Sequence, residues 1–99
     1  MNAAQRYRLR LYVAGSTPRS MLAVTNIRRI CELHLAGQYD LEVVDIYQHP
    51  EVAADAQIIA APTLIKLSPE PTRRAIGDLS NADKVLATLS LPLGPGHGS

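Results

Sequence analysis

Hydrophobic positions along the first half of the chain follow two different periods. Residues 8–13 alternate between polar and apolar side chains, which predicts a β-strand that ends before Gly15. From Thr17-Pro18 to about residue 35 the apolar side chains recur every three or four positions, which predicts a helix. We expect Thr17 to cap its first turn and Gly37 to end it in a left-handed conformation. The expected apolar stripe consists of Met21, Val24, Ile27, Ile30 and Cys31.

Shorter elements follow after residue 40. Residues 41–46 predict a second strand, and a single helix between two strands favours parallel pairing through a right-handed crossover. His49-Pro50 opens a short alanine-rich helix that is expected to reach about Gln57. Pro62 then ends helical geometry, so residues 63–67 are expected to form a third strand.

A hairpin and a last helix complete the expected order. Two prolines within residues 68–71 predict a turn, because proline cannot donate to a strand ladder, and residues 73–76 predict the returning strand. Ser80, followed three residues later by Asp83, predicts the cap of a final helix. The apolar face of that helix consists of Ala82, Val85, Leu86 and Leu89.

The resulting order, βαβαββα with a proline before the third strand, is the thioredoxin topology. We therefore expect an α/β fold built on a central mixed sheet. Residues 85–91 also fit a second interpretation, because Val85, Ala87, Leu89 and Leu91 occupy every second position, as in a strand. The local sequence does not commit this segment to helix or strand.

Composition limits the classes of function that the chain can serve. A length of 99 residues suits one domain, expected over residues 1–91, with a Pro/Gly-rich flexible tail at residues 92–99. The net charge of +1 provides no overall attraction to nucleic acid or anionic lipid. No segment has the length of a membrane span or the pattern of a secretion signal, so we expect a cytoplasmic protein.

The residues that would carry thioredoxin chemistry are missing from the expected turn. A thiolate is needed where the first helix begins, but that turn contains only Ser16, Thr17 and Pro18. The single cysteine, Cys31, lies deep on the apolar stripe and should behave as a small hydrophobic residue. The three histidines are too scattered for a metal site, and no glycine-rich phosphate loop is present. We therefore expect no enzyme activity and no cofactor.

Two other features have a functional and a structural interpretation. Pro62 would support binding of an extended peptide if its peptide bond were cis, but most X-Pro bonds are trans and the sequence leaves the isomer open. The arginine pairs at positions 28–29 and 73–74 favour solvated faces or protein contacts over nucleic acid, because Phe and Trp are absent and acidic residues are interspersed.

Three segments in the same order and at matching spacing resemble the KaiB family of circadian-clock proteins. They are residues 11–18 (LYVAGSTP), residues 61–64 (APTL) and residues 73–80 (RRAIGDLS), and the resemblance extends over about residues 7–91. It implies a non-enzymatic protein that binds a KaiC-type hexameric ATPase and modulates its phosphorylation cycle. KaiA-like proteins or a sensor histidine kinase are further implied partners.

The resemblance also implies two folds for one chain. KaiB-like proteins exchange between an oligomeric ground state, dimer or tetramer, of order βαββααβ and a thioredoxin-like state that binds partners. Their second halves differ, which suits the dual periodicity of residues 85–91. The residues expected to define the fold are Pro62, Gly77, Asp78, Thr88 and Ser90.

Candidate partner contacts follow from the same resemblance. The expected contact face consists of Leu41, Glu42 and Val43 of the second strand with Gln57, and the second-choice contacts are Lys66, Arg73 and Arg74. Clock members tend to carry lysine where this chain has Glu42 and Gln57, and Gly-x-Asp where it has residues 88–90, which suggests a diverged paralogue. The alternatives are a paralogue in stress regulation without an oscillator, a thioredoxin-like thiol- or peptide-handling protein, and a purely structural oligomer.

Overall fold

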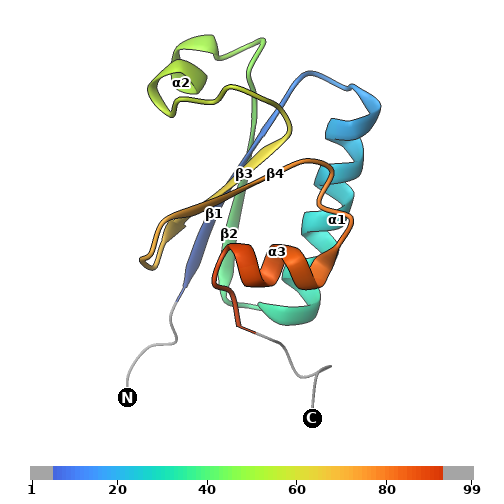
Figure 1. Cartoon of the computed structure of the whole chain (residues 1–99), viewed down its shortest axis with the longest axis vertical. Coiled ribbons are helices and arrows are strands. Elements are labelled where there is room, and N and C mark those ends of the chain that lie inside the picture. Colours follow the sequence, from blue (N-terminus) through green and yellow to red (C-terminus); the bar gives the residue numbers. More distant parts are fainter. Residues whose placement is uncertain (1–5, 93–99) are drawn as a thin grey trace.

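A four-stranded mixed sheet with helices on both faces forms the centre of the molecule (Figure 1). The computed structural model describes residues 6–92, so the expected tail lies outside the described residues except for Pro92. The elements are β1 (Tyr7–Val13), α1 (Pro18–His34), β2 (Tyr39–Asp45), α2 (Pro50–Asp55), β3 (Thr63–Ser68), β4 (Arg73–Ile76) and α3 (Ala82–Thr88). This order, βαβαββα, confirms the expected thioredoxin-like fold.

The strands lie in the order β2-β1-β3-β4, so that β2 and β4 form the two edges. β1 pairs with β2 in parallel, with Leu9 opposite Leu41 and Leu11 opposite Val43, as the βαβ pattern predicted. β3 runs antiparallel to both β1 and β4. The two edges of the sheet therefore come from the two halves of the chain.

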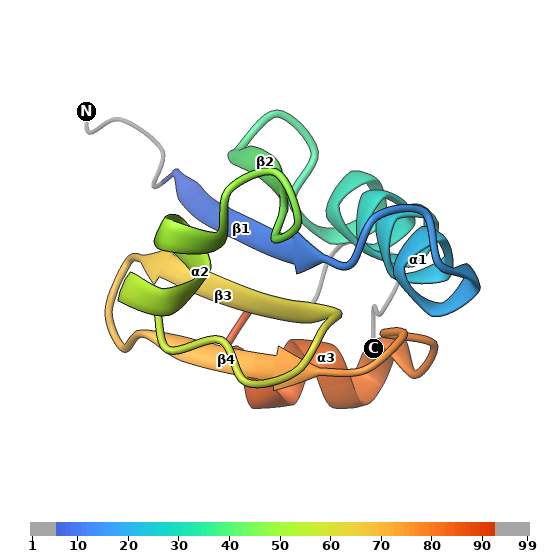
Figure 2. The ribbon, with the colours of Figure 1, turned by 90° about the horizontal axis from the view of Figure 1, so that it is seen from above.

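Helices α1 and α3 cover one face of the sheet, and α2 lies on the other (Figure 2). The alternating strand residues explain this arrangement, because successive side chains point to opposite faces. The main core joins Leu9, Leu11 and Val13 of β1 to buried residues of α1 and α3. A smaller cluster on the opposite face consists of Tyr12, Val44 and Ile65, with partly buried residues of α2 packed against it.

The apolar stripe of α1 differs from the expected one at its first turn. Ile27, Ile30 and Cys31 are buried as predicted, but Met21 is 53% exposed. Ser20 and Ala23 are buried instead, and the Ser20 hydroxyl accepts a hydrogen bond from the Ala14 N–H at 3.0 Å. The helix thus turns a small polar residue toward the β1–α1 turn, which a count of apolar residues does not detect.

The two predicted helix starts have different outcomes. Thr17 is the N-cap residue of α1, as expected, but its hydroxyl makes no cap hydrogen bond, and Pro18 supplies the helical φ of the first position. The cap of α3 is Asn81 rather than Ser80, and its Oδ1 accepts from the Lys84 N–H at 3.1 Å. Ser80 lies one residue before this cap, and its N–H donates to Asp78 Oδ1 at 3.0 Å.

Both short helices, α2 and α3, end in the same left-handed arrangement. In α2, Gln57 has φ +57°, its N–H donates to Ala54 O, and the Ile58 N–H donates to Ala53 O. In α3, Ser90 has φ +55°, and the Ser90 and Leu91 N–H groups donate to the carbonyls of Ala87 and Leu86. These are Schellman motifs, whose left-handed position is usually occupied by glycine.

In the segment with two interpretations, residues 85–88 are helical and residues 89–91 form the end of the helix and the turn after it. Val85, Leu86 and Leu89 are at most 4% exposed and belong to the main core. A helix places these three side chains on one face toward the sheet, whereas a strand would separate Leu86 from the other two. Burial of the leucines therefore decides between the two periods.

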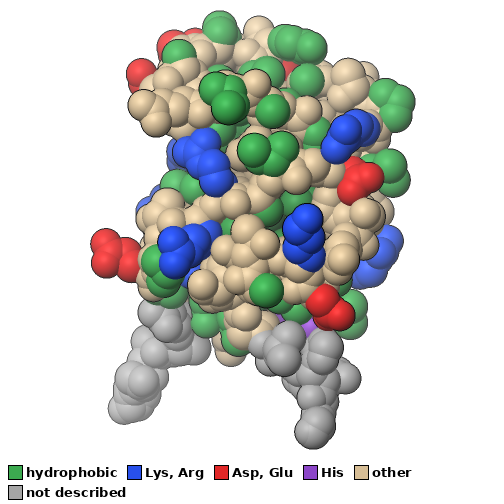
Figure 3. Space-filling model, viewed as in Figure 1, with side chains coloured by type: hydrophobic (Ala, Val, Ile, Leu, Met, Phe, Trp, Pro, Cys, Tyr) green, Lys and Arg blue, Asp and Glu red, His purple; other side chains and the backbone are tan. Residues whose placement is uncertain are grey.

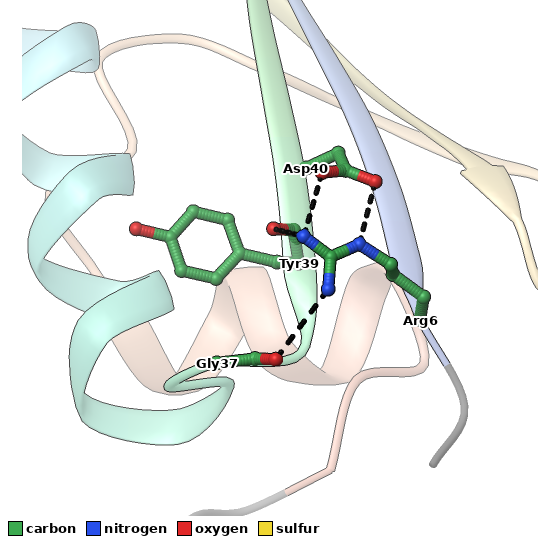
Figure 4. Close-up of polar contacts among 4 residues, drawn as sticks. All are labelled: Arg6, Gly37, Tyr39 and Asp40. Atoms are coloured by element: carbon green, nitrogen blue, oxygen red, sulfur yellow. Dashed lines mark hydrogen bonds and ion pairs between the residues drawn. The ribbon is translucent and has the colours of Figure 1, made fainter. Parts of the chain in front are cut away.

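An arginine at the start of the described chain joins β1 to the α1–β2 turn (Figure 4). Arg6 forms a two-pronged ion pair with Asp40, with both nitrogen–oxygen distances at 2.8 Å, and also donates to the Tyr39 and Gly37 carbonyls. Gly37 has φ +74° and so provides the left-handed turn that was expected after α1. The bonded Arg6 guanidinium lowers the pKa of Asp40 below its usual value.

Candidate partner-binding surface

The turn between β1 and α1 holds no thiol and is closed by other side chains. Gly15 has φ +58°, and its N–H donates to Asp45 Oδ1 at 3.2 Å. The same carboxylate oxygen accepts from the Tyr47 N–H at 2.9 Å. A methyl group on Gly15 would lie 3.3 Å from the Tyr47 ring, so the turn is also packed tightly. Asp45 and Tyr47 thus hold the β1–α1 turn against the β2–α2 connection.

Cys31 has the environment of a structural cysteine. Its side chain is fully buried in the main core, and burial raises the pKa of the thiol to about 12. A thiol that stays protonated and inaccessible neither attacks disulfides nor binds metals. Within residues 6–92, moreover, no group of three or more His, Cys, Asp or Glu side chains is arranged to hold a metal ion.

Pro62 lies just before β3, at the open end of the β3–β4 hairpin. The Ala61–Pro62 peptide bond, whose isomer the sequence left open, is cis. Pro62 is buried, and its carbonyl accepts from the Gly77 N–H at 3.0 Å. The left-handed Gly77, with φ +119°, thereby fixes the end of β4 beside the start of β3.

The three β2 candidates lie on an edge strand but face both sides of the sheet. Leu41 is partly buried against the main core and Val43, on the same side, is 39% exposed. Glu42 points to the other side, where its Oε1 lies 2.8 Å from Arg10 Nε. Arg10 also donates to the Tyr12 hydroxyl at 3.4 Å, and these hydrogen bonds raise the pKa of Arg10. The surface of β2 thus combines an apolar edge with an ion pair.

Gln57 and Arg74 meet at the end of α2. The Arg74 guanidinium donates to the Gln57 carbonyl at 3.2 Å and to the Ala56 carbonyl at 3.0 Å. These carbonyls belong to the C-cap residue of α2 and the residue after it, at the helix end where a cation is favourable. Because Arg74 lies on β4, this pair is on the opposite edge of the sheet from β2.

Lys66 and Arg73 have different exposures, although they are neighbours in the β3–β4 register. Lys66 is 1% exposed and its Nζ donates to the Ser90 carbonyl at 3.5 Å. Burial, with a smaller effect of Arg73, lowers the pKa of Lys66. In this fold Lys66 ties β3 to the end of α3 and is not exposed, so its role as a partner contact stays a prediction. Arg73 is exposed.

Several exposed apolar side chains were missed by the sequence analysis. Ile59 is 91% exposed, Tyr47 69% and Ile76 60%. Figure 3 shows apolar side chains gathered over the upper part of the molecule, around α2 and the adjoining loops. Ile59 could have been suspected, because it belongs to an apolar stretch that fits neither a helical nor a strand period. Exposed apolar surface of this kind is typical of interaction sites.

Comparisons of the sequence point to one family. Residues 10–91 match the family model of the KaiB domain. A protein named circadian clock oscillator protein KaiB from Prochlorococcus marinus strain NATL2A is 50% identical over 91 residues, which are 92% of this chain and 85% of that protein. The protein of the same name from Parasynechococcus marenigrum strain WH8102 is 46% identical over 91 residues, 92% of this chain and 88% of that protein.

Comparisons of the structure give the fold. The N-terminal domain of SasA from Synechococcus elongatus matches with a TM-score of 0.72 and 23% identity, over 91% of this chain and 89% of that domain. The germline-specific thioredoxin Deadhead from Drosophila melanogaster matches with a TM-score of 0.69 and 9% identity, over 87% of this chain and 80% of that protein. Of the helices within residues 6–92, none is long and apolar enough to cross a membrane.

Proposed function

Since the chain belongs to the KaiB family, we propose that it is a regulatory binding protein of a KaiC-type clock or clock-like signalling system. It binds a hexameric KaiC-type ATPase and modulates the phosphorylation cycle of that ATPase. The observation that carries the proposal is the match of the KaiB domain over residues 10–91, together with relatives named as clock oscillator proteins over 92% of the chain.

The fold supports the binding step of this proposal. The resemblance implies that the partner-binding state is thioredoxin-like, and the element order βαβαββα is of that kind. The SasA N-terminal domain shares this fold. The sensor histidine kinase that the family resemblance implies is a further proposed partner. KaiA-like proteins remain further proposed partners.

The proposed contact surface lies at the β2 edge. Val43 supplies exposed apolar area, and Glu42 supplies a charge held in place by Arg10. A carboxylate where clock members tend to carry lysine calls for a partner surface with the opposite charge. We therefore assign to this chain a KaiC homologue whose contact surface carries a basic residue near Glu42. This pairing suits a diverged paralogue, with or without an oscillator.

Exchange with a second, oligomeric fold is the other part of the proposal. Among the described residues of the first half, the left-handed positions are the glycines Gly15 and Gly37. In the second half Gln57, Leu79 and Ser90 hold that conformation as well. A left-handed non-glycine residue costs roughly 1–2 kcal/mol, and two packings of one chain can differ by only a few kcal/mol. These costs reduce the free-energy difference between the thioredoxin-like fold and the fold of order βαββααβ.

A thiol-handling function is not favoured. The turn that would carry the reactive thiol has none, and Cys31 is buried with its pKa raised to about 12. Neither the matched family nor the names of the relatives indicates a catalytic activity.

Size-exclusion chromatography with a KaiC homologue from the source organism tests the proposal. With ATP present, the chain is expected to co-elute with the hexamer. Val43→Glu should abolish co-elution, because it places a charge on the apolar β2 edge. The matched control is Leu33→Glu, an equally polar change at an exposed apolar residue of α1, outside the β2 edge. Absence of co-elution with every KaiC homologue of the organism would refute the proposed function.

A further inference from the structure

An open groove of about 420 Å³ lies between β4, the start of α1 and α3. Its apolar lining includes Ile76, Leu79 and Val85, and its charged lining includes Arg19 from α1 and Lys84 from α3. We call this groove, defined by these five residues, the basic groove. The β2 edge, which carries the proposed function, lies at the other side of the sheet.

The charges in the basic groove are unbalanced compared with the whole chain. Arg19, Arg74 and Lys84 line it together with a single acid, Asp78, whereas the chain has 10 basic and 9 acidic residues. Arg74 is already engaged, because its guanidinium donates to the α2 carbonyls. Arg19 and Lys84 form no ion pair with any carboxylate within residues 6–92.

The Arg19 guanidinium lies beside Gly77, the glycine that follows β4. A methyl group on Gly77 would lie 3.5 Å from Arg19 Nη2, so the guanidinium extends from α1 to the β4–α3 loop. Hydrogen bonds from Ser80 are the main cause of the lowered pKa of Asp78, and Arg19 lies near enough to contribute. Asp78 Oδ1 is bound to the Ser80 N–H, which leaves Asp78 a partial counterion for Arg19.

The loop that shapes the groove is held by three hydrogen bonds. The largely buried Asn26 side chain donates to the Asp78 carbonyl at 2.8 Å, and the Gly77 N–H donates to the Pro62 carbonyl at 3.0 Å. The third bond is the Asn81 cap on the Lys84 N–H. These bonds fix the β4–α3 loop and the backbone of Lys84 before any ligand binds, which lowers the cost of ordering the site.

We propose that the basic groove binds an acidic segment of a partner protein. A carboxylate of the segment lies between Arg19 and Lys84, and a neighbouring apolar side chain of the segment packs on Ile76, Leu79 and Val85. Arginine can hold a carboxylate with two parallel hydrogen bonds, and lysine adds a mobile positive charge. Apolar walls beside a pair of basic residues favour a peptide over a small inorganic anion, because only the peptide can contact the basic pair and the apolar walls at the same time.

A labelled peptide of alternating glutamate and leucine, 10 residues long, tests this inference without any ATPase. Fluorescence anisotropy is expected to show binding that weakens with added salt. Amide chemical shifts should change most at residues 76–85. The double variant Arg19→Gln/Lys84→Gln should bind at least tenfold more weakly, while its circular dichroism stays unchanged because both side chains are exposed.

The matched control removes two other charges. Arg28 and Arg29 are exposed on α1 and do not line the groove, so Arg28→Gln/Arg29→Gln should bind the peptide within twofold of the parent chain. Equal weakening by both double variants would overturn the inference, because it would show attraction to charge in general. Displacement of the peptide by inorganic phosphate, beyond the effect of sodium chloride at equal ionic strength, would also overturn it. Since no ATPase is present, neither result bears on the proposed function.

Discussion

Replacing Gln57 by glycine is expected to stabilise the thioredoxin-like fold. Gln57 occupies the left-handed position of the Schellman motif that ends α2, with φ +57°. Its side chain is exposed, and Arg74 binds its carbonyl, which glycine keeps. The substitution therefore removes a steric conflict between the β-carbon and the backbone without removing a native hydrogen bond.

The size of the effect follows from two opposing terms. A non-glycine residue in the left-handed region costs roughly 1–2 kcal/mol. Glycine adds conformational freedom to the unfolded chain, which costs roughly 0.4–1 kcal/mol. The difference is a gain of about 1 kcal/mol, which corresponds to a rise in melting temperature of roughly 4–8 °C for a chain of this size.

Chemical denaturation followed by circular dichroism measures this gain directly. Gln57→Ala is the first control, because it shortens the side chain but keeps the β-carbon, and it should leave the free energy of unfolding nearly unchanged. Gln48→Gly is the second control, since Gln48 is also exposed and lies outside the left-handed region. It should lower the free energy of unfolding by roughly 0.4–1 kcal/mol.

Equal destabilisation of the protein by Gln57→Gly and Gln48→Gly would contradict this prediction. Such a result would mean that residue 57 is not left-handed in solution. Ser90 provides an independent repeat, because it has φ +55° at the corresponding position of α3. If two folds exchange, Gln57→Gly should also raise the population in which amide chemical shifts report residues 85–88 as helical.

Two further predictions concern an arginine and the cysteine. Arg74→Ala should lower the free energy of unfolding by about 1 kcal/mol, because it removes the two hydrogen bonds to the Ala56 and Gln57 carbonyls. Arg73→Ala should have little effect, and urea titration of both variants measures the difference. Cys31 should react with a thiol reagent at pH 8 only after unfolding. Because its pKa rises from 9.0 to about 12 on folding, the unfolded thiol ionises first, so stability should fall as pH rises above about 9, and Cys31→Ala should reduce this fall.

The first half of the fold could be predicted in detail from local patterns. Alternation in β1, helical spacing in α1 and the glycine after it do not conflict, so each segment has one good conformation. Thr17 occupies the expected N-cap position without a side-chain hydrogen bond, whereas Ser80 failed as a cap because its backbone does not lie at the N-cap position. Asn81, one residue later, fulfils the role.

The proposed contact residues could be predicted less well than the fold. The positions of Leu41, Glu42 and Val43 on an edge strand became evident only with the strand order. Lys66 was a second-choice contact on the family resemblance, but β3 is an inner strand and the Lys66 side chain lies beneath the end of α3. Exposure depends on which elements cover a strand, and the local sequence does not contain that information.

The sequence by itself determined the order of the elements, the absence of a thiol at the β1–α1 turn and the resemblance to one family. These properties depend on residue identity and on short-range periodicity, both of which are properties of the local sequence. The tertiary structure decided that residues 82–88 are helical, because only a helix buries Val85, Leu86 and Leu89 together against the sheet. It also brought Arg19 and Lys84, which are far apart in the chain, to one groove. Packing between distant segments, and not local propensity, settled both.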